Sequence, residues 1–208
     1  MLATLIRKAM WGLVLAVTSS VVSAGAQPPT QRPPPLDPAR PKSWRAAVRE
    51  RTQRLDRMAA ELISVAKDKT RQEAVRRKAI LLLGTIGNER ALKFLVGNVG
   101  LIVPLDAEPA DAHPMLDRPC AYALMGVHNG RTHWNAVPLI IGALCEPTRL
   151  GDETRRDLAA ILHVTCGGRR ALVILRQALN DAKSPDAASN VKAALERVET
   201  LVARDPPK

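Results

Sequence analysis

The sequence predicts an all-α fold in which about eight helices stack in pairs as a superhelix. Three observations lead to this prediction. Aromatic residues make up only 2% of the 208 residues, so a core must be built from Leu, Ala, Val and Ile, and the windows rich in Leu and Ala favour helix. Apolar side chains recur at helical spacing along much of the chain. A helix-turn-helix pattern also occurs three times with a period of about 40 residues, which is typical of stacked helical repeats.

Residues 1–26 have the layout of a secretory signal peptide. Arg7 and Lys8 precede an apolar stretch, and small residues follow it up to an Ala-x-Ala pattern at 24–26. We therefore expect cleavage between Ala26 and Gln27, export to the periplasm or the medium, and no transmembrane segment after cleavage. The alternative is an uncleaved anchor helix, but the apolar stretch at 9–22 is short for a bilayer and contains Thr and Ser.

A proline-rich segment follows at 27–43. It contains seven prolines and no apolar periodicity, which predicts an extended, semi-rigid tether. A proline-rich ligand of the PxxP kind is the sharper alternative, although its usual readers are intracellular. The helical domain is then expected at 44–203, followed by a short tail at 204–208.

Apolar periodicity places the individual helices. We expect them at 44–67, 70–86, 88–98, 116–128, 133–145, 151–165, 168–181 and 187–203. The apolar faces that define four of them are Leu55, Met58, Leu62 and Val65 in the first helix, Val75, Ala79, Leu82, Leu83 and Ile86 in the second, Ala171, Leu172, Leu175 and Leu179 in the seventh, and Val191, Ala194, Leu195, Val198 and Leu201 in the last.

Glycines and one acidic residue mark where helices end or begin. The expected turn glycines are Gly84, Gly87, Gly130, Gly167 and Gly168, since glycine adopts the left-handed conformation that ends helices. Asp152 is expected to cap the N-terminus of the sixth helix.

The three repeat copies lie at 79–95, 121–140 and 158–175, and an Arg-x-x-Ala element opens each one, at Arg76, Arg118 and Arg156. The segment VRRKAILLLGTIGNERALKFL (75–95) resembles the helix-turn-helix of a HEAT repeat of the short bacterial type. The second copy keeps Leu-Met-Gly at 124–126 and Ala-Val-Pro-Leu at 136–139, whereas the third has His163 where a glycine is expected. The resemblance implies a right-handed α-α superhelix, and such repeats mostly serve as binding scaffolds.

No catalytic signature supports an enzyme, and no cofactor or metal is predicted. The chain lacks the two phosphate-binding glycine motifs, G-x-x-x-x-G-K-[ST] and G-x-G-x-x-G. It also lacks the zinc-protease motif H-E-x-x-H, the G-x-S-x-G motif of serine hydrolases and C-x-x-C. Ser64 and Lys67 match S-x-x-K, but the two companion motifs of penicillin-binding enzymes are missing. His163 and Cys166 are spaced to share a metal, yet they need two further ligands and are expected simply to pack. His113, close to Asp106, Glu108 and Asp111, fits no known cation loop.

Three cysteines are an odd number for an exported protein. Cys120 opens one expected helix and Cys145 closes the antiparallel helix that follows, so those two ends would lie side by side. If one disulfide forms, we expect it between Cys120 and Cys145. The alternative is three buried thiols that only pack.

The net charge of +11 is concentrated at the N-terminal side. After the signal peptide, Lys and Arg exceed Asp and Glu only up to residue 93. A face with Arg45, Arg49, Arg76, Arg77 and Lys78 would suit an anionic partner, or it is a solvated helix surface. Nucleic acid is disfavoured by export and by the shortage of aromatic side chains. The segment 99–117, with three prolines, interrupts the repeats as a partner-contacting loop or as a simple insertion.

The expected function is therefore a non-catalytic scaffold, monomeric or weakly associating, that binds a protein partner outside the cytoplasm. Two alternatives stay open. One is a lyase-type or accessory enzyme, because some HEAT-like bacterial proteins resemble bilin lyases. The other is a basic module that adheres to an anionic envelope polymer.

Overall fold

The computed structural model of the chain describes residues 40–104, 117–126 and 133–204. The expected signal peptide, with its cleavage site between Ala26 and Gln27, lies outside these residues, as do nearly all of the tether, most of the 99–117 segment and the last four residues. The chain divides into two units, Met1–Trp44 and Arg45–Lys208. The contacts reported below lie within the second unit.

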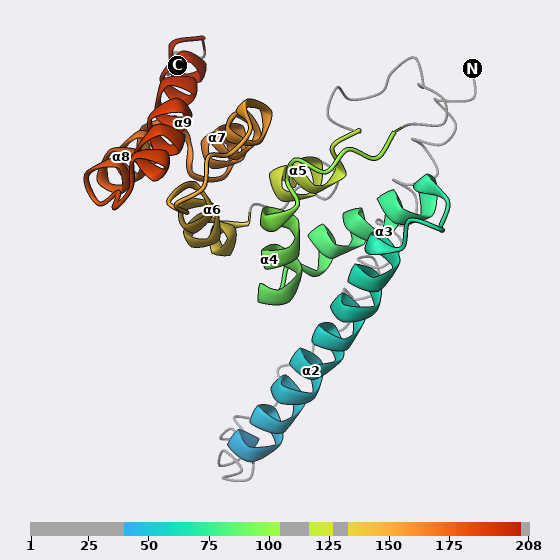
Figure 1. Cartoon of the computed structure of the whole chain (residues 1–208). Helices are drawn as coiled ribbons and strands as arrows, with labels where there is room; N and C mark the ends of the chain where they lie inside the picture. The colour runs from blue at the N-terminus through green and yellow to red at the C-terminus, as the bar shows by residue number, and fades with distance from the viewer. Residues whose placement is uncertain (1–39, 105–116, 127–132, 205–208) are drawn as a thin grey trace, which may run out of the picture. The chain divides into compact units, whose positions relative to one another are not determined.

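The described residues form an all-α structure, as predicted, with eight α-helices and no strand. The helices are α2 (Arg40–Lys67), α3 (Glu73–Ile86), α4 (Glu89–Gly97), α5 (Pro119–Met125), α6 (Val137–Leu144), α7 (Asp152–Cys166), α8 (Gly168–Asn180) and α9 (Pro185–Arg204), with a 3-10 turn, η1 (Trp134–Ala136), before α6 (Figure 1). Each expected helix is present, and its ends lie within a few residues of the predicted ones.

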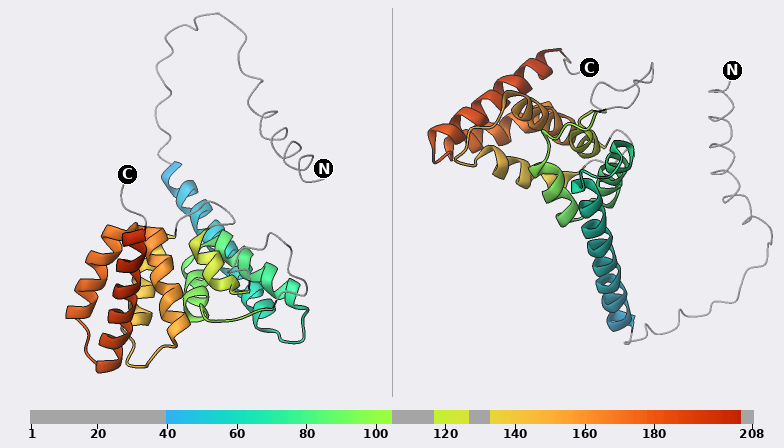
Figure 2. Two further views of the ribbon diagram at one scale, coloured as in Figure 1. Left: turned by 90° about the horizontal axis from the view of Figure 1, so that it is seen from above. Right: turned by 45° about the vertical axis from the view of Figure 1, so that its right-hand side comes forward.

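Packing within the Arg45–Lys208 unit runs between helices that are close in sequence. Helix α3 packs on α4 and α5, α5 packs on α7, and α7 packs on α8 and α9. Helix α4 contacts α5 and α6, α6 contacts α7 and α9, and α8 lies against α9 (Figure 2). A helix therefore finds its main partners one or two positions along the chain.

Aliphatic side chains form the core that these helices share, as the composition predicts. Its largest fully buried members include Ile80, Leu92, Leu124, Leu158 and Leu175, and Phe94 is the aromatic residue in it. Alanines let the helices approach closely: Ala59 and Ala66 give α2 its buried positions. Burial of these aliphatic groups is the main stabilising contribution to such a fold.

Local sequence sets the helix ends. Gly87 and Gly126 end α3 and α5 in the left-handed conformation, with φ of 58° and 67°. Asn88 caps α4, because its side chain accepts a hydrogen bond of 2.9 Å from the Ala91 N–H. The same amide donates to Asp56 at 2.7 Å, which fastens α2 to the α3–α4 turn.

Some predicted helix ends were wrong. Gly84 lies buried inside α3, and Gly168 is the first residue of α8 rather than a turn residue. Gly151, not Asp152, occupies the N-cap of α7. Asp152 is the first helical residue and pairs with Arg155 one turn later, so its charge contributes near the N-terminal end without a capping bond. Gly130 lies outside the described residues.

A single residue, Gly167, joins α7 to α8. It has φ of 76° and ψ of 145°, and its N–H donates to the carbonyl of His163 at 2.9 Å. The third repeat copy therefore ends its first helix three residues after His163, at Cys166. A glycine at 167 supplies the positive φ that His163 could not supply.

Candidate binding surfaces

An apolar groove lies between α2 and α3 and encloses about 390 Å³. Its lining residues are Met58, Glu61, Leu62 and Val65 from α2 and Leu82, Thr85 and Ile86 from α3. Met58 and Leu82 are each more than 40% exposed, whereas Leu62, Val65 and Ile86 are half-buried and rest on the core. The half-buried residues thus form the floor of an apolar groove, and the exposed Met58 and Leu82 form its rim.

The two helices leave this groove open because their buried faces point elsewhere. Helix α2 buries Ala59 and Ala66, and α3 buries Ala79, Ile80 and Leu83. The groove residues fall on the adjoining stripe of each helix, so both helices are apolar over more of their circumference than the core covers. Apolar surface of this kind, once exposed, marks interaction sites.

Five arginines of α2, between residues 45 and 57, precede the groove residues of this helix in the sequence. Arg49, Arg51, Arg54 and Arg57 are all exposed, as is Arg45. Within the described residues, none of the five takes part in an ion pair. Glu50 and Asp56 are the acidic residues among them. The Asp56 carboxylate accepts a hydrogen bond from Asn88, and the main-chain carbonyl of Asp56 accepts one from Arg90.

Of the five residues in the predicted basic face, three are exposed and two bond to backbone carbonyls. Arg45 and Arg49 are exposed on α2 and Lys78 on α3. Arg76 instead donates to the Ala66 carbonyl at 3.1 Å, and Arg77 donates to the carbonyls of Val103 and Pro104. These two side chains hold neighbouring backbone segments, so the free positive charge follows α2 rather than α3. Arg51, Arg54 and Arg57, which belong to the same basic stretch of the sequence, are exposed as well.

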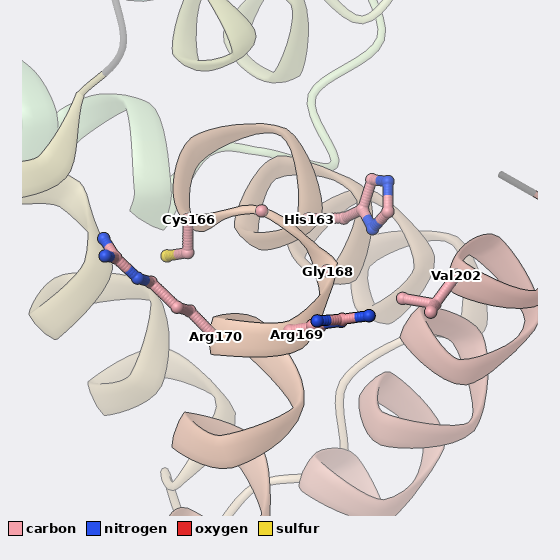
Figure 3. A pocket seen from close by; sticks show the side chains of 7 residues that line it. His163, Cys166, Gly168, Arg169, Arg170 and Val202 are labelled. Atoms are coloured by element: carbon pink, nitrogen blue, oxygen red, sulfur yellow. The ribbon is translucent and has the colours of Figure 1, made fainter. Parts of the chain in front are cut away.

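A second cleft, of about 400 Å³, lies at the α7–α8 junction beside the end of α9. Its lining residues are His163, Cys166, Gly167, Gly168, Arg169, Arg170 and Val202 (Figure 3). Figure 3 shows Arg170 extending to the side of Cys166 and Arg169 extending towards Val202. The Arg170 guanidinium lies over the Trp134 ring, 5.9 Å from its centroid. Because the Arg170 guanidinium contacts Trp134, Arg169 is the cation of the cleft that is more accessible to a ligand.

Close packing at this junction depends on Gly168. A Cβ atom there would lie 2.3 Å from Val202 Cγ2 and 3.1 Å from the His163 ring. His163 and Cys166 border one cleft. Among the described residues, however, no group of three or more His, Cys, Asp or Glu side chains is close enough to hold a metal ion. His113 and its acidic neighbours lie outside those residues.

The three cysteines are free thiols in the structure, so the expected Cys120–Cys145 bridge is not formed in it. Cys120 is fully buried at the start of α5, and burial raises its pKa to about 12. Cys145 is half-buried, and its pKa is raised by burial and by the nearby charge of Asp181 after α8.

A partly buried charge cluster connects the start of α5 to α7. Arg118 binds Asp157 through contacts of 3.2 and 3.3 Å and Glu153 at 2.8 Å. Asp157 is almost fully buried, and this burial raises its pKa although the charge of Arg118 opposes the shift. Both carboxylates pair with Arg118, so these contacts serve the packing of the two helices.

Comparison with family models, with curated proteins and with solved structures gives no match to this chain in any of the three. Within the described residues, no helix is both long enough and apolar enough to cross a membrane.

Proposed function

We propose that this protein is an exported, non-catalytic scaffold of HEAT-like helix pairs that binds another protein. The observation that carries the proposal is the open apolar groove between α2 and α3. Met58 and Leu82 are exposed on its rim while its floor rests on the core, and an exposed apolar surface of this kind suits a protein partner.

The packing of the helices supports the repeat interpretation. The three sequence copies correspond to α3–α4, α5–α6 and α7–α8. Their first helices pack on one another, α3 on α5 and α5 on α7, and α9 continues this row by packing on α7. Apart from the smaller contact between α6 and α9, these contacts join neighbouring units, as in stacked helical repeats.

Export rests on the N-terminal sequence pattern. Cell fractionation followed by N-terminal sequencing of the purified protein tests it. We expect the protein outside the cytoplasm with Gln27 as its first residue. Recovery from the cytoplasm with an intact N-terminus would refute this part of the proposal.

Partner binding is tested by capture from envelope extract. The full chain is expressed with a C-terminal tag, so that the exported form becomes the bait, and the resin is washed at low and at high salt. We expect a protein to stay bound at high salt, because apolar contacts are not screened by salt as surface charges are.

A second candidate function is adhesion to an anionic envelope polymer. The five exposed arginines of α2 favour it. In that case the retained material is polymer, and it is lost from the resin as salt rises. Retention of nothing at either salt concentration would refute both functions.

A further inference from the structure

We propose that the α2–α3 groove binds one amphipathic helix of the partner protein, with the apolar face of that helix on Met58, Leu62 and Leu82 and acidic side chains along the edge that faces the α2 arginines. This inference rests on the scaffold function and assigns both the surface and the chemistry of its ligand.

The groove favours a helix over an extended peptide. Its walls are two α-helices, whose backbone N–H and C=O groups are already bonded within each helix. An extended peptide would find no backbone partners there, whereas a helix satisfies its own. A helix in a groove is also an established mode by which amphipathic peptides are recognised.

The spacing of apolar residues on α2 matches such a ligand. Val48, Leu55, Met58, Leu62 and Val65 follow one another at intervals of three, four or seven residues, the spacing with which a helix meets another helix. Met58 to Val65 covers about 10 Å of α2, and Val48 to Val65 covers about 25 Å. A partner helix of roughly 17 residues would span the longer distance.

Arg51 stands within this apolar series, and Arg54 and Arg57 lie beside it, all three exposed. Glu61 is the acidic residue in the groove lining. A ligand laid along α2 would therefore pass the positive charges of Arg51, Arg54 and Arg57 before it reaches the apolar floor. Acidic side chains on the ligand would be attracted there, and basic ones repelled.

This charge pattern selects a different protein over a second copy of the chain. A second α2 would bring the same arginines to the interface. Like charges that face each other across an interface weaken binding. The favoured occupant is therefore a foreign helix with an acidic edge.

The test uses three synthetic 17-residue peptides and the full chain, with binding measured by fluorescence anisotropy. The first has apolar residues at heptad spacing and Glu at the flanking positions. The second replaces each Glu by Lys, and the third has the first sequence with two central prolines, which prevent a helix. We expect the acidic helix to bind at least about tenfold more tightly than either of the other two. Equal binding of all three, or no binding of the acidic helix, would overturn the proposal.

Matched variants locate the binding surface. Leu82→Glu places a charge in the groove, and Val173→Glu makes the same change at an exposed position of α8. We expect the first to weaken the acidic peptide at least about tenfold and the second to leave it unchanged. The circular dichroism spectrum and melting temperature of each variant establish that it is folded. If Leu82→Glu does not fold, Met58→Glu on the opposite wall serves in its place.

Charge reversals test the acidic edge. The triple change Arg51→Glu, Arg54→Glu and Arg57→Glu should reverse the preference between the acidic and the basic peptide. Lys183→Glu, Lys192→Glu and Arg204→Glu alter the net charge equally at exposed positions near and within α9, and we expect the preference to stay. A preference that follows net charge in both triples would refute the assigned edge.

The two proposals fail in distinguishable ways. If the wild-type chain and the Leu82→Glu variant capture the same protein from extract, the scaffold function stands and the groove assignment is wrong. If the wild-type chain captures nothing, the scaffold function is wrong, whatever the peptides show.

Discussion

Replacing Arg118 by alanine should expose the cost of one buried charge, Asp157. The side chain of Asp157 keeps 8% of its surface exposed and that of Arg118 keeps 22%. In the Arg118→Ala variant the Asp157 carboxylate would stay buried without its counter-charge. Removing one partner of a buried pair costs about 3–5 kcal/mol of unfolding free energy. Because Arg118 is itself partly exposed, we expect the lower end, about 3 kcal/mol.

The loss should depend on pH in a defined direction. Burial raises the pKa of Asp157 above its ordinary value of 3.8, so this group favours the folded state at low pH and loses that contribution as pH rises through its folded pKa. Without Arg118 that pKa should rise further, because the hydrogen bonds and the charge that lower it are gone. The stability difference between wild type and Arg118→Ala should therefore be largest near about pH 7 and shrink towards about pH 4.

Urea unfolding followed by circular dichroism at both pH values measures the effect. The matched control is Arg176→Ala, which breaks a pair between α8 and α9 with Glu199 at 3.3 Å, where both side chains are largely exposed. We expect the control to lose less than about 1 kcal/mol. Adding Asp157→Asn to Arg118→Ala should remove the pH dependence. A loss as small as that of the control, or one that does not change with pH, would refute the reasoning.

Three further predictions concern packing, one buried amide and the thiols. Gly168→Ala should lower the unfolding free energy by about 1–3 kcal/mol, because the added methyl group meets α9. The control Gly142→Ala lies in α6 with no other atoms near its added methyl group, so it should be neutral or stabilising by up to about 1 kcal/mol. Equal effects of the two variants in urea titrations would contradict this prediction. Asn190→Ala should cost about 2–3 kcal/mol, because two backbone groups of the α6–α7 loop lose their partner at 2.7 and 3.0 Å; unchanged hydrogen exchange in that loop would argue against it. Cys145 should react with a thiol reagent in the native protein and Cys120 only after unfolding, and fast native labelling of Cys120 would refute its burial.

The sequence was sufficient for the helices because local signals and burial agree along most of the chain. Apolar spacing located each helix, and Gly87 marked the C-terminal end of α3 to the residue. Prediction failed where two local signals competed. Asp152 has the side chain of a good cap, but it forms an ion pair with Arg155 and leaves the cap to Gly151.

The candidate site was only partly predictable. The basic character of the N-terminal helices is visible in the sequence, and so is the apolar face of α2. Which arginines are free is not, because Arg76 and Arg77 bond to carbonyls that lie ten and more residues away. The groove likewise depends on how far the core extends over Leu62 and Ile86, which only the packing of α2 on its neighbours determines.

The one-residue joint at Gly167 fixes the rotational phase of α8 relative to α7. Each added residue turns a helix by about 100°. A single insertion there would swing Ala171, Leu175 and Ala178, the buried residues of α8, away from the surface that they cover. The α6–α7 connection is longer, running from Cys145 to Gly151. A loop of this length can accommodate the same insertion without rotating the helix that follows. An insertion at Gly167 should therefore disrupt the packing of α8, whereas an insertion in the α6–α7 connection should be tolerated.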